Sequence, residues 1–238
     1  MNALMPTSSA SARVAEIALA GMEAVCDPRG ALFVPAWRLL AVSDLHLEKG
    51  AALARRGSLV PPYDTAATLA RLRHVIDDYR PHIVVSLGDS FHDGQGSARL
   101  PEVFRSALRD MMAGRDWYWI AGNHDPDAPD DLPGRSVQEL VVGPLTFRHE
   151  PVAGAGNGEI AGHLHPGARV VLRGRSVRRP CFASDGNRMV MPAFGAYTGT
   201  LNVLDRAYHG LFGVERLIAY MLGRGRVFPI AGAMLRAG

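Results

Sequence analysis

Five short polar signatures, each placed directly after an apolar run, constrain this chain more than any other feature of its sequence. They combine histidine, aspartate and asparagine with glycine, and in chain order they are Asp44-Leu45-His46, Gly88-Asp89, Gly122-Asn123-His124-Asp125, His149 and Gly162-His163-Leu164-His165. A short apolar run that ends at such a segment is typical of a buried strand that leads into a loop. The sequence therefore predicts a sheet-based fold whose reactive side chains lie at the ends of strands.

The first half of the chain alternates predicted strands with predicted helices. Short apolar runs predict strands over residues 14–19, 23–26, 32–34, 39–42, 82–87 and 117–121. Apolar residues at helical spacing predict helices over residues 51–56, 64–79 and 102–113. The second helix begins at Asp64 or Thr65 and stops before Pro81. This alternation predicts an α/β fold with hairpin-linked strands near its N-terminal end.

The second half of the chain has shorter apolar runs, and glycine or proline separates most of them. These runs predict antiparallel strands over residues 137–142, 145–149, 159–163, 168–172, 188–191 and 201–204. A final helix is predicted over residues 214–222. Residues 1–12 are small and polar, and we expect them to be flexible. Together the two halves predict one domain over residues 1–238 with two packed sheets.

The composition is that of an ordinary globular protein, with 47% hydrophobic and 21% charged residues. No apolar stretch approaches the length of a membrane span, and the N-terminus lacks the features of a secretory signal. Cys26 and Cys181 belong to no Cys-x-x-Cys pattern and are expected to be reduced. We therefore expect a cytoplasmic protein without a membrane partner. A formal net charge of +3 permits a nucleic-acid partner but does not require one.

The first two signatures supply two carboxylates and one imidazole. In an extended segment Asp44 and His46 would point to the same side, so that the carboxylate and the imidazole converge. Asp89 follows a strand and a glycine, and its two oxygens could bridge two ions. Taken alone, an aspartate at such a place is more often a turn residue.

The later signatures add an amide and more imidazoles. Asn123 can offer a neutral oxygen to a metal, which leaves His124 free to donate a proton or to bind phosphate, while Asp125 could orient a neighbour. Alone, this segment could also be a tight turn with a surface histidine. Five of the nine histidines lie in the signatures, however, so we interpret the set as one metal site. The other histidines are assigned to surface or loop roles: His74, His82, His92 and His209.

Several residues near the signatures have two possible roles. Lys49, the only lysine, could bind phosphate as a point charge or lie on the surface. Phe91, His92 and Tyr63 could stack on a base near the site, although isolated aromatic residues more often pack. Six arginines after the last signature form either a strip that follows a phosphate backbone or a solvated strand face. They are Arg169, Arg173, Arg175, Arg178, Arg179 and Arg188.

The order D-x-H, GD, GNH-D, H and GH-x-H over residues 44–165 resembles that of the calcineurin-like metallophosphoesterases. The resemblance implies a four-layer αββα fold, which is a two-sheet β-sandwich flanked by helices. It also implies two divalent metal ions bridged by Asp89. One ion would be held by Asp44, His46, Asp89 and His165, and the other by Asp89, Asn123, His149 and His163. His124 would be the histidine beside the phosphate that binds no metal.

Four segments, at residues 44–50, 59–65, 87–93 and 192–199, are similar to the bacterial ligase-associated DNA damage response endonucleases. This resemblance implies a phosphodiesterase, and more narrowly a nuclease that acts in DNA repair. The substrate would be nucleic acid or another phosphodiester. It also implies a functional association with a DNA ligase and a helicase.

The implied mechanism follows from charge. Two divalent ions lower the pKa of a bridging water, so that hydroxide can attack the phosphorus. Only Asp44 and Asp89 among the implied ligands are anionic, so the site keeps a positive charge that attracts an anionic ester. His124, with Asp125 beside it, would act as the general acid toward the leaving oxygen. The ligand set suits Mn²⁺ best, and Fe or Zn would also fit.

Two other functions stay open at this point. A phosphomonoesterase or nucleotide pyrophosphatase would use the same metal core. A scaffold of the same fold would lack catalysis, but the complete ligand set and the intact His124 weigh against it.

Overall fold

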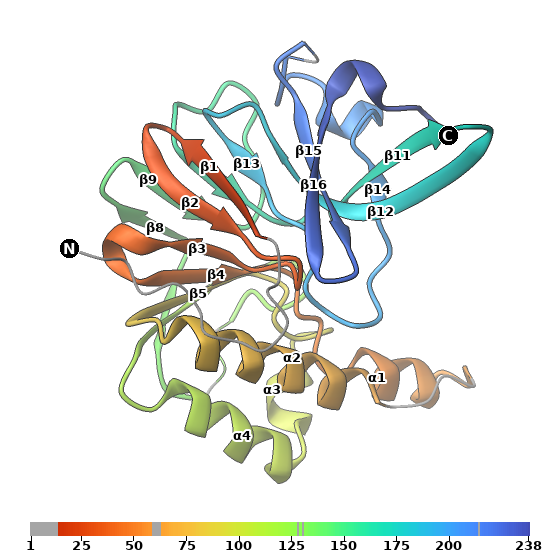
Figure 1. Ribbon diagram of the computed structural model, residues 1–238. Helices are drawn as coiled ribbons and strands as arrows, with labels where there is room; N and C mark the ends of the chain where they lie inside the picture. Colours follow the sequence, from red (N-terminus) through yellow and green to blue (C-terminus); the bar gives the residue numbers. More distant parts are fainter. Residues whose placement is uncertain (1–13, 59–62, 128, 130, 214) are drawn as a thin grey trace.

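The computed structural model describes residues 14–58, 63–127, 129, 131–213 and 215–238. These residues form two β-sheets that pack face to face, with helices on the outer side of one sheet (Figure 1). The predicted two-sheet sandwich flanked by helices is confirmed. The segment expected to be flexible, residues 1–12, lies outside the described residues.

The first sheet has the strand order β1-β2-β3-β4-β5-β6-β7. Its strands are β1 (Ala15–Leu19), β2 (Met22–Cys26), β3 (Leu32–Val34), β4 (Leu39–Val42), β5 (Ile83–Leu87), β6 (Asp116–Ile120) and β7 (Arg135–Val137). Strands β1 to β4 pair antiparallel, as the predicted hairpins require, and β4 to β7 pair parallel. Because parallel strands end at the same edge, this sheet brings together the segments that follow β4, β5 and β6.

The second sheet has the order β14-β11-β12-β13-β10-β9-β8, and β15 and β16 continue beside β12. Its strands are β8 (Glu139–Val142), β9 (Leu145–Arg148), β10 (Glu159–Ala161), β11 (Pro166–Leu172), β12 (Arg175–Ser184), β13 (Met189–Val190), β14 (Leu201–Asn202), β15 (Ile218–Gly223) and β16 (Arg226–Ala231). The predicted strand over 137–142 is therefore two strands, β7 and β8, which belong to different sheets.

The prediction that all strands of the second half are antiparallel is wrong. Strand β9 pairs parallel with β10, β10 parallel with β13, and β11 parallel with β14. Short apolar strands give the same sequence pattern in either direction, so the pattern does not distinguish them. The correction matters for the site, because β9 and β10 end at the same edge and lead into His149 and His163.

The predicted helix over residues 214–222 is also wrong, because residues 218–223 form strand β15. Ala219 and Met221 pack on the outer face of the second sheet, while Tyr220 and Leu222 face the first sheet. A run that is apolar at every position fits a helix or a strand buried on both faces, and here the strand forms.

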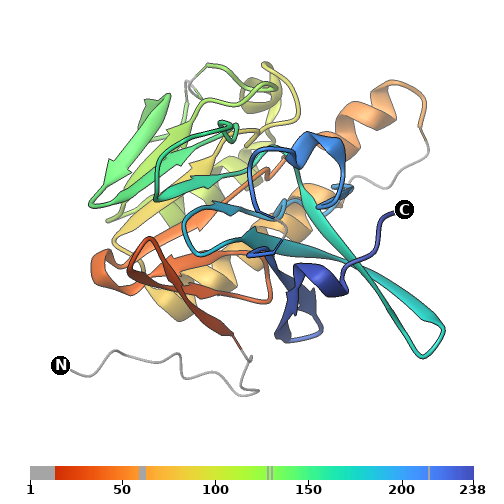
Figure 2. The ribbon, with the colours of Figure 1, turned by 90° about the horizontal axis from the view of Figure 1, so that it is seen from above.

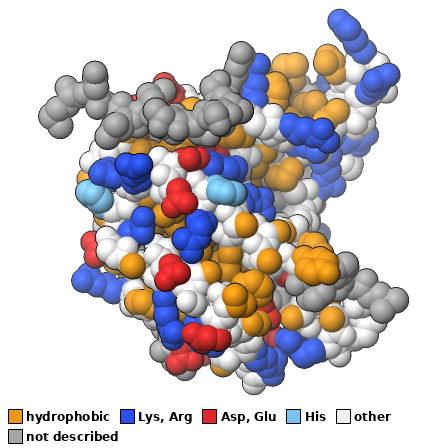
Figure 3. Space-filling view, turned by 60° about the horizontal axis from the view of Figure 1, so that its bottom comes forward, with side chains coloured by type: hydrophobic (Ala, Val, Ile, Leu, Met, Phe, Trp, Pro, Cys, Tyr) orange, Lys and Arg blue, Asp and Glu red, His pale blue; other side chains and the backbone are white. Residues whose placement is uncertain are grey.

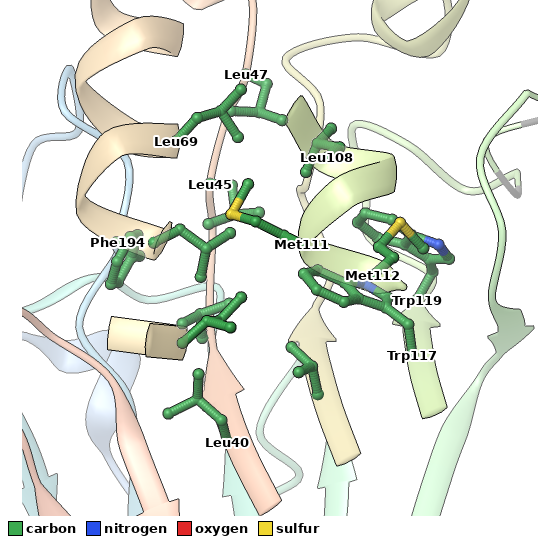
Figure 4. Close-up of a cluster of buried hydrophobic side chains, with 14 of the residues drawn as sticks. Leu40, Leu45, Leu47, Leu69, Leu108, Met111, Met112, Trp117, Trp119 and Phe194 are labelled. Atoms are coloured by element: carbon green, nitrogen blue, oxygen red, sulfur yellow. The ribbon is translucent and has the colours of Figure 1, made fainter. Parts of the chain in front are cut away.

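The α-helices cover the outer face of the first sheet (Figure 1). They are α1 (Lys49–Arg55), α2 (Asp64–Tyr79), α3 (Gly96–Arg99) and α4 (Glu102–Met112). The three predicted helices are confirmed as α1, α2 and α4. Leu40 of β4 and Trp117 and Trp119 of β6 belong there to one buried cluster with Leu69 of α2 and Met111 of α4 (Figure 4).

The two sheets enclose a second core, because side chains alternate along each strand. Leu39 and Ala41 point away from the helices and meet Phe147 and Phe182 of the second sheet. Every residue of β4 is thus buried, on one face or the other. This double burial fixes the end of β4, where the first signature begins.

The outer face of the second sheet has a different cover. The 3-10 helix η2 (Arg206–Tyr208) and neighbouring loops bring Tyr208, Leu211 and Leu217 onto Cys181. In the described part of the chain, the fourth layer of the expected αββα arrangement is thus made of loops and 3-10 turns instead of α-helices. The other 3-10 helices are η1 (Pro35–Trp37) and η3 (Gly232–Met234). Among the described helices, none has the length and apolar character needed to cross a membrane.

Candidate metal centre

The signatures meet because two sets of parallel strands end at facing edges. Asp44, Asp89 and Asn123 follow β4, β5 and β6 of the first sheet, and His149 and His163 follow β9 and β10 of the second. The His46 N–H donates to the Asp89 carbonyl oxygen at 2.9 Å. The Gly162 N–H donates to the His149 carbonyl oxygen at 2.9 Å. The loops of each sheet are thus joined by backbone hydrogen bonds.

Five of the predicted ligands have a left-handed backbone, which non-glycine residues adopt rarely. Their φ angles lie between 44° and 65°, and they are Asp44, His46, Asp89, His163 and His165. The prediction that Asp44 to His46 is extended is therefore wrong. Leu45 between them is buried in the core beneath the helices. Such strained backbone persists only where the surroundings hold it, and it is typical of functional sites.

Glycines in the signatures allow the loops to approach closely. A Cβ at Gly122 would overlap the backbone nitrogen and carboxylate of Asp89, and one at Gly162 would overlap the Ser43 hydroxyl. A Cβ at Gly88, which has φ 73°, would overlap the His149 ring. Each of these glycines is therefore required by packing around a predicted ligand.

The first group that could hold a metal ion is Asp44, His46 and His165, whose ligand atoms all lie within 4.8 Å of one another. His165 Nε2 lies 3.2 Å from Asp44 Oδ1 and 3.4 Å from His46 Nε2. Asp44 is fully buried, and its Oδ1 has no hydrogen-bond partner among the described residues. Its Oδ2 accepts from the Ser43 hydroxyl and the His163 N–H. A buried carboxylate oxygen that has no hydrogen-bond partner is well suited to bind a cation.

The second group is Asp89, His149 and His163. His149 Nε2 lies 3.5 Å from Asp89 Oδ1 and 3.2 Å from His163 Nδ1. His149 Nδ1 donates to the Leu87 carbonyl oxygen at 2.8 Å, which leaves the Nε2 lone pair directed toward the group. Asp89 Oδ2 lies 3.9 Å from His46 Nε2 of the first group. The two oxygens of Asp89 therefore face different groups.

The protonation of these side chains suits metal binding. Burial lowers the pKa of His46 to about 3, so its ring is neutral and can donate a lone pair. Burial and the neighbouring His149 lower the pKa of His163. Burial alone would raise the pKa of Asp44, but His165 and His149 hold it below its usual value. A neutral imidazole at His46 beside an ionised carboxylate at Asp44 is a pair of donors that divalent ions accept.

Asn123 and His124 lie on the open side of the centre. Asn123 Nδ2 donates to Glu150 Oε1 at 2.8 Å, so the amide oxygen of Asn123 is left for another partner. Glu150 also lies 3.7 Å from His163 Nε2. Sequence reasoning missed Glu150, although its position directly after His149 was the available signal.

The His124 side chain is 50% exposed, and its backbone N–H donates to Asp89 Oδ1 at 2.9 Å. His124 Nδ1 donates to the His92 carbonyl oxygen at 3.0 Å, and Nε2 lies 4.0 Å from Asp89 Oδ2. The His92 ring stacks on the His124 ring at 5.7 Å between centroids. His92 thus lies in a loop, as one of its two predicted roles required, and this loop places its ring beside the centre.

The remaining predicted site residues near the centre are Asp125, Phe91 and Lys49. Asp125 accepts from the Phe91 N–H at 3.0 Å, so the neighbour that it holds is the backbone of Phe91 and not the ring of His124. Burial raises the pKa of Asp125 to about 7. Phe91 is 2% exposed and packs near Trp119, so its ring does not reach a substrate. Lys49 is close enough that its charge contributes to the low pKa of His46.

The six arginines are not one strip. Arg188 is buried and donates to the carbonyl oxygens of Val152 and Ala155, so it supports a loop. The others lie on β11, on β12 or in the turn between them. Tyr63 is 71% exposed, and His74, His82 and His209 are exposed as expected.

Comparison with known proteins places this arrangement among enzymes. Residues 38–183 match the family described as calcineurin-like phosphoesterase. The search of curated proteins found no match. The crystal structure of the Pseudomonas putida nuclease MPE is similar, with 30% sequence identity and a TM-score of 0.70. That similarity covers 92% of this chain and 100% of the other.

Proposed function

This chain belongs to the calcineurin-like phosphoesterase family and is a metal-dependent hydrolase of phosphoester bonds, and we propose that it is a phosphodiesterase that cleaves nucleic acid. The observation that carries the proposal is the position of Asp89. Its two oxygens face two separate groups of possible metal ligands, at 3.5 Å and 3.9 Å. A carboxylate placed in this way suits two ions close together, which is a common arrangement in phosphatases and nucleases.

We infer the ligand sets from the two groups. One ion would be held by Asp44, His46, Asp89 and His165, and the other by Asp89, Asn123, His149 and His163. Bound divalent ions supply Lewis acidity and activate water for attack on phosphorus. Only two of these ligands are anionic, so the loaded centre favours an anionic ester. The oxygen and nitrogen donors suit Mn²⁺ best, and Fe or Zn would also fit.

His124 is the proposed general acid. Its Nδ1 is held by the His92 carbonyl oxygen, so Nε2 is the atom that can hold a proton and donate it to the leaving oxygen. Half of the side chain is exposed, which leaves room for a substrate. Asp125 supports the loop that carries His92 by accepting a hydrogen bond from the Phe91 N–H. The His92 ring stacks on the His124 ring and keeps it in place.

A nucleic-acid substrate is supported by the similar crystal structure, since that protein is a nuclease. The segments at residues 44–50, 59–65, 87–93 and 192–199, which resemble the ligase-associated endonucleases, support a role in DNA repair. They also support a functional association with a DNA ligase and a helicase. A cytoplasmic location, in which Cys26 and Cys181 stay reduced, is a separate part of the proposal. These finer assignments remain part of the proposal.

The test is a substrate screen on metal-depleted protein titrated with Mn²⁺, Fe²⁺ or Zn²⁺. We expect hydrolysis of bis-p-nitrophenyl phosphate and cleavage of oligonucleotides, both lost on chelation, with elemental analysis giving about two ions per chain. Hydrolysis of p-nitrophenyl phosphate alone would instead indicate a phosphomonoesterase. Undiminished turnover after complete removal of metal would contradict the proposal.

A further inference from the structure

Strands β11 and β12 form a hairpin that projects from the second sheet (Figures 1 and 2). The two strands pair in register from Gly167 opposite Pro180 to Leu172 opposite Arg175. Residues 171–179 are all exposed. We name residues 169–179 the arginine arm. A regular hairpin that buries none of its outer residues contributes little to the core, so its sequence calls for another explanation.

The arginine arm has uncompensated positive charge. It contains Arg169, Arg173, Arg175, Arg178 and Arg179, while residues 166–184 contain no aspartate or glutamate. Within the described residues none of the five forms an ion pair, whereas Arg29, Arg105 and Arg148 elsewhere each pair with a carboxylate. Figure 3 shows positive side chains gathered on the projecting part at the upper right, with no acidic side chain visible among them.

Two of these arginines oppose each other within the hairpin. Arg169 and Arg178 are register partners, so their side chains leave the same face of the two strands. Like charges placed directly opposite in an antiparallel pair are destabilising. Arg175 and Arg179 leave the other face, where no described side chain or backbone group binds them. This distribution is unfavourable for the folded hairpin alone and favourable for one that meets a polyanion.

The base of the arm is fixed to the metal centre. Strand β11 begins directly after His165, and the Leu201 N–H donates to the His165 carbonyl oxygen at 2.9 Å. Arg178 Nε donates to Thr200 Oγ1 at 3.2 Å, next to that contact. At roughly 3.3 Å per residue, the arm extends about 25 Å from His165 to its turn at Arg173. A polymer bound at the centre could therefore follow the arm for several phosphates.

We propose that the arginine arm binds the sugar–phosphate backbone of the nucleic-acid strand that enters or leaves the metal centre. The inference rests on the proposed nuclease function and adds to it the surface that holds the polymer outside the site of cleavage. Guanidinium groups suit this role because they bind phosphate through two parallel hydrogen bonds. The arm acts on binding of a long substrate and takes no part in the hydrolysis itself.

The test compares R175Q/R179Q with the matched variant R80Q/R135Q in the Mn²⁺-loaded enzyme. Arg80 and Arg135 are exposed. They lie before β5 and at the start of β7, which is the end of the first sheet opposite to the strand ends that carry the proposed ligands. The kcat/KM for a single-stranded oligonucleotide is measured over a range of salt, with bis-p-nitrophenyl phosphate as the small substrate. We expect the arm variant to lose roughly tenfold on the oligonucleotide, and the salt slope to fall by about 1.4 for two phosphate contacts. Turnover of the small diester stays unchanged in both variants.

The experiment distinguishes failure of the inference about the arm from failure of the proposed nuclease function. If wild-type enzyme cleaves oligonucleotides and the arm variant matches R80Q/R135Q, the arm does not bind nucleic acid although the nuclease function stands. If wild-type enzyme hydrolyses only the small diester, the proposed function fails, and with it the inference. An equal loss on both substrates would mean that the arm supports the centre itself, which also overturns the inference.

Discussion

The metal centre and the arginine arm, although joined at His165, are built in opposite ways. In the centre, Asp44, Asp89 and His149 are almost fully buried, and the loops that carry them have left-handed backbone or closely packed glycines. In the arm the backbone is a regular antiparallel hairpin and residues 171–179 are exposed. Metal binding needs ligand atoms at fixed positions, and the fold accepts strain to supply them. Attraction of a polyanion needs only charge along a surface, so removing single groups should cost far less in the arm.

The largest expected effect is that of Asp89→Asn. It removes the carboxylate that faces both ligand groups, and we expect activity on bis-p-nitrophenyl phosphate to fall at least about 10⁴-fold. Without metal, the variant should melt close to wild type. The rise in Tm that Mn²⁺ gives to wild type should largely disappear, because a ligand stabilises the folded state little once its Kd exceeds its concentration. A variant that kept its activity and its Mn²⁺-dependent rise in Tm would contradict the role of Asp89.

His124→Ala should have the next largest effect. We expect kcat to fall about 10²–10⁴-fold, as for the loss of a general acid, while metal content stays near two ions per chain. His209→Ala, at an exposed histidine outside the site, is the matched control and should leave kcat unchanged. Loss of metal from His124→Ala would instead make His124 a ligand.

The contrast between centre and arm also explains what the sequence could predict. The ends of β4 and β5 were predicted to the residue and that of β6 to within one residue, because each strand is a buried apolar run stopped by a glycine or a polar signature. These are local signals, and they place Asp44, Asp89 and Asn123 at strand ends without knowledge of the fold. The left-handed backbone at Asp44 and His46 was missed, because it depends on Leu45 being drawn into the core beneath the helices.

Non-local features could not be predicted in the same way. The parallel pairing of β9 with β10, which brings His149 and His163 together, depends on chain direction and not on apolar pattern. Strand β12 begins with the arginine-rich segment 175–179, which has no apolar alternation to reveal a strand. These residues form a strand because they pair with β11. For the same reason, the sequence alone could not decide between a phosphate-binding strip and a solvated strand face.

Gly122→Ala tests how closely the loops of the centre are packed. The new Cβ would overlap Asp89, so the loop must shift, and a displacement of about 1 Å can lower activity about 10²-fold. Overpacking of this kind costs about 1–3 kcal/mol, which lowers Tm by roughly 2–12 °C in a chain of this size. Gly156→Ala is the matched control, since a Cβ there has no neighbour within 4 Å and should change neither value. Equal behaviour of the two variants would argue against a tightly packed centre.

The smallest effect within the centre is expected for Glu150→Ala. Glu150 holds the amide of Asn123 from the open side, and loss of such a supporting hydrogen bond typically weakens metal affinity about tenfold. The readout is the binding of the second ion, followed through the absorbance of Co²⁺ as it fills the two sites. Glu139→Ala is a close control, because the two glutamate side chains are 52% and 55% exposed and the ion pair of Glu139 is with Arg148, which is not one of the proposed ligands. Glu150→Gln keeps an oxygen that can accept from Asn123, so it should restore most of the affinity. If the Ala and Gln variants both bind the second ion as wild type does, the support from Glu150 is dispensable, and the open side of the centre then tolerates change as the arm does.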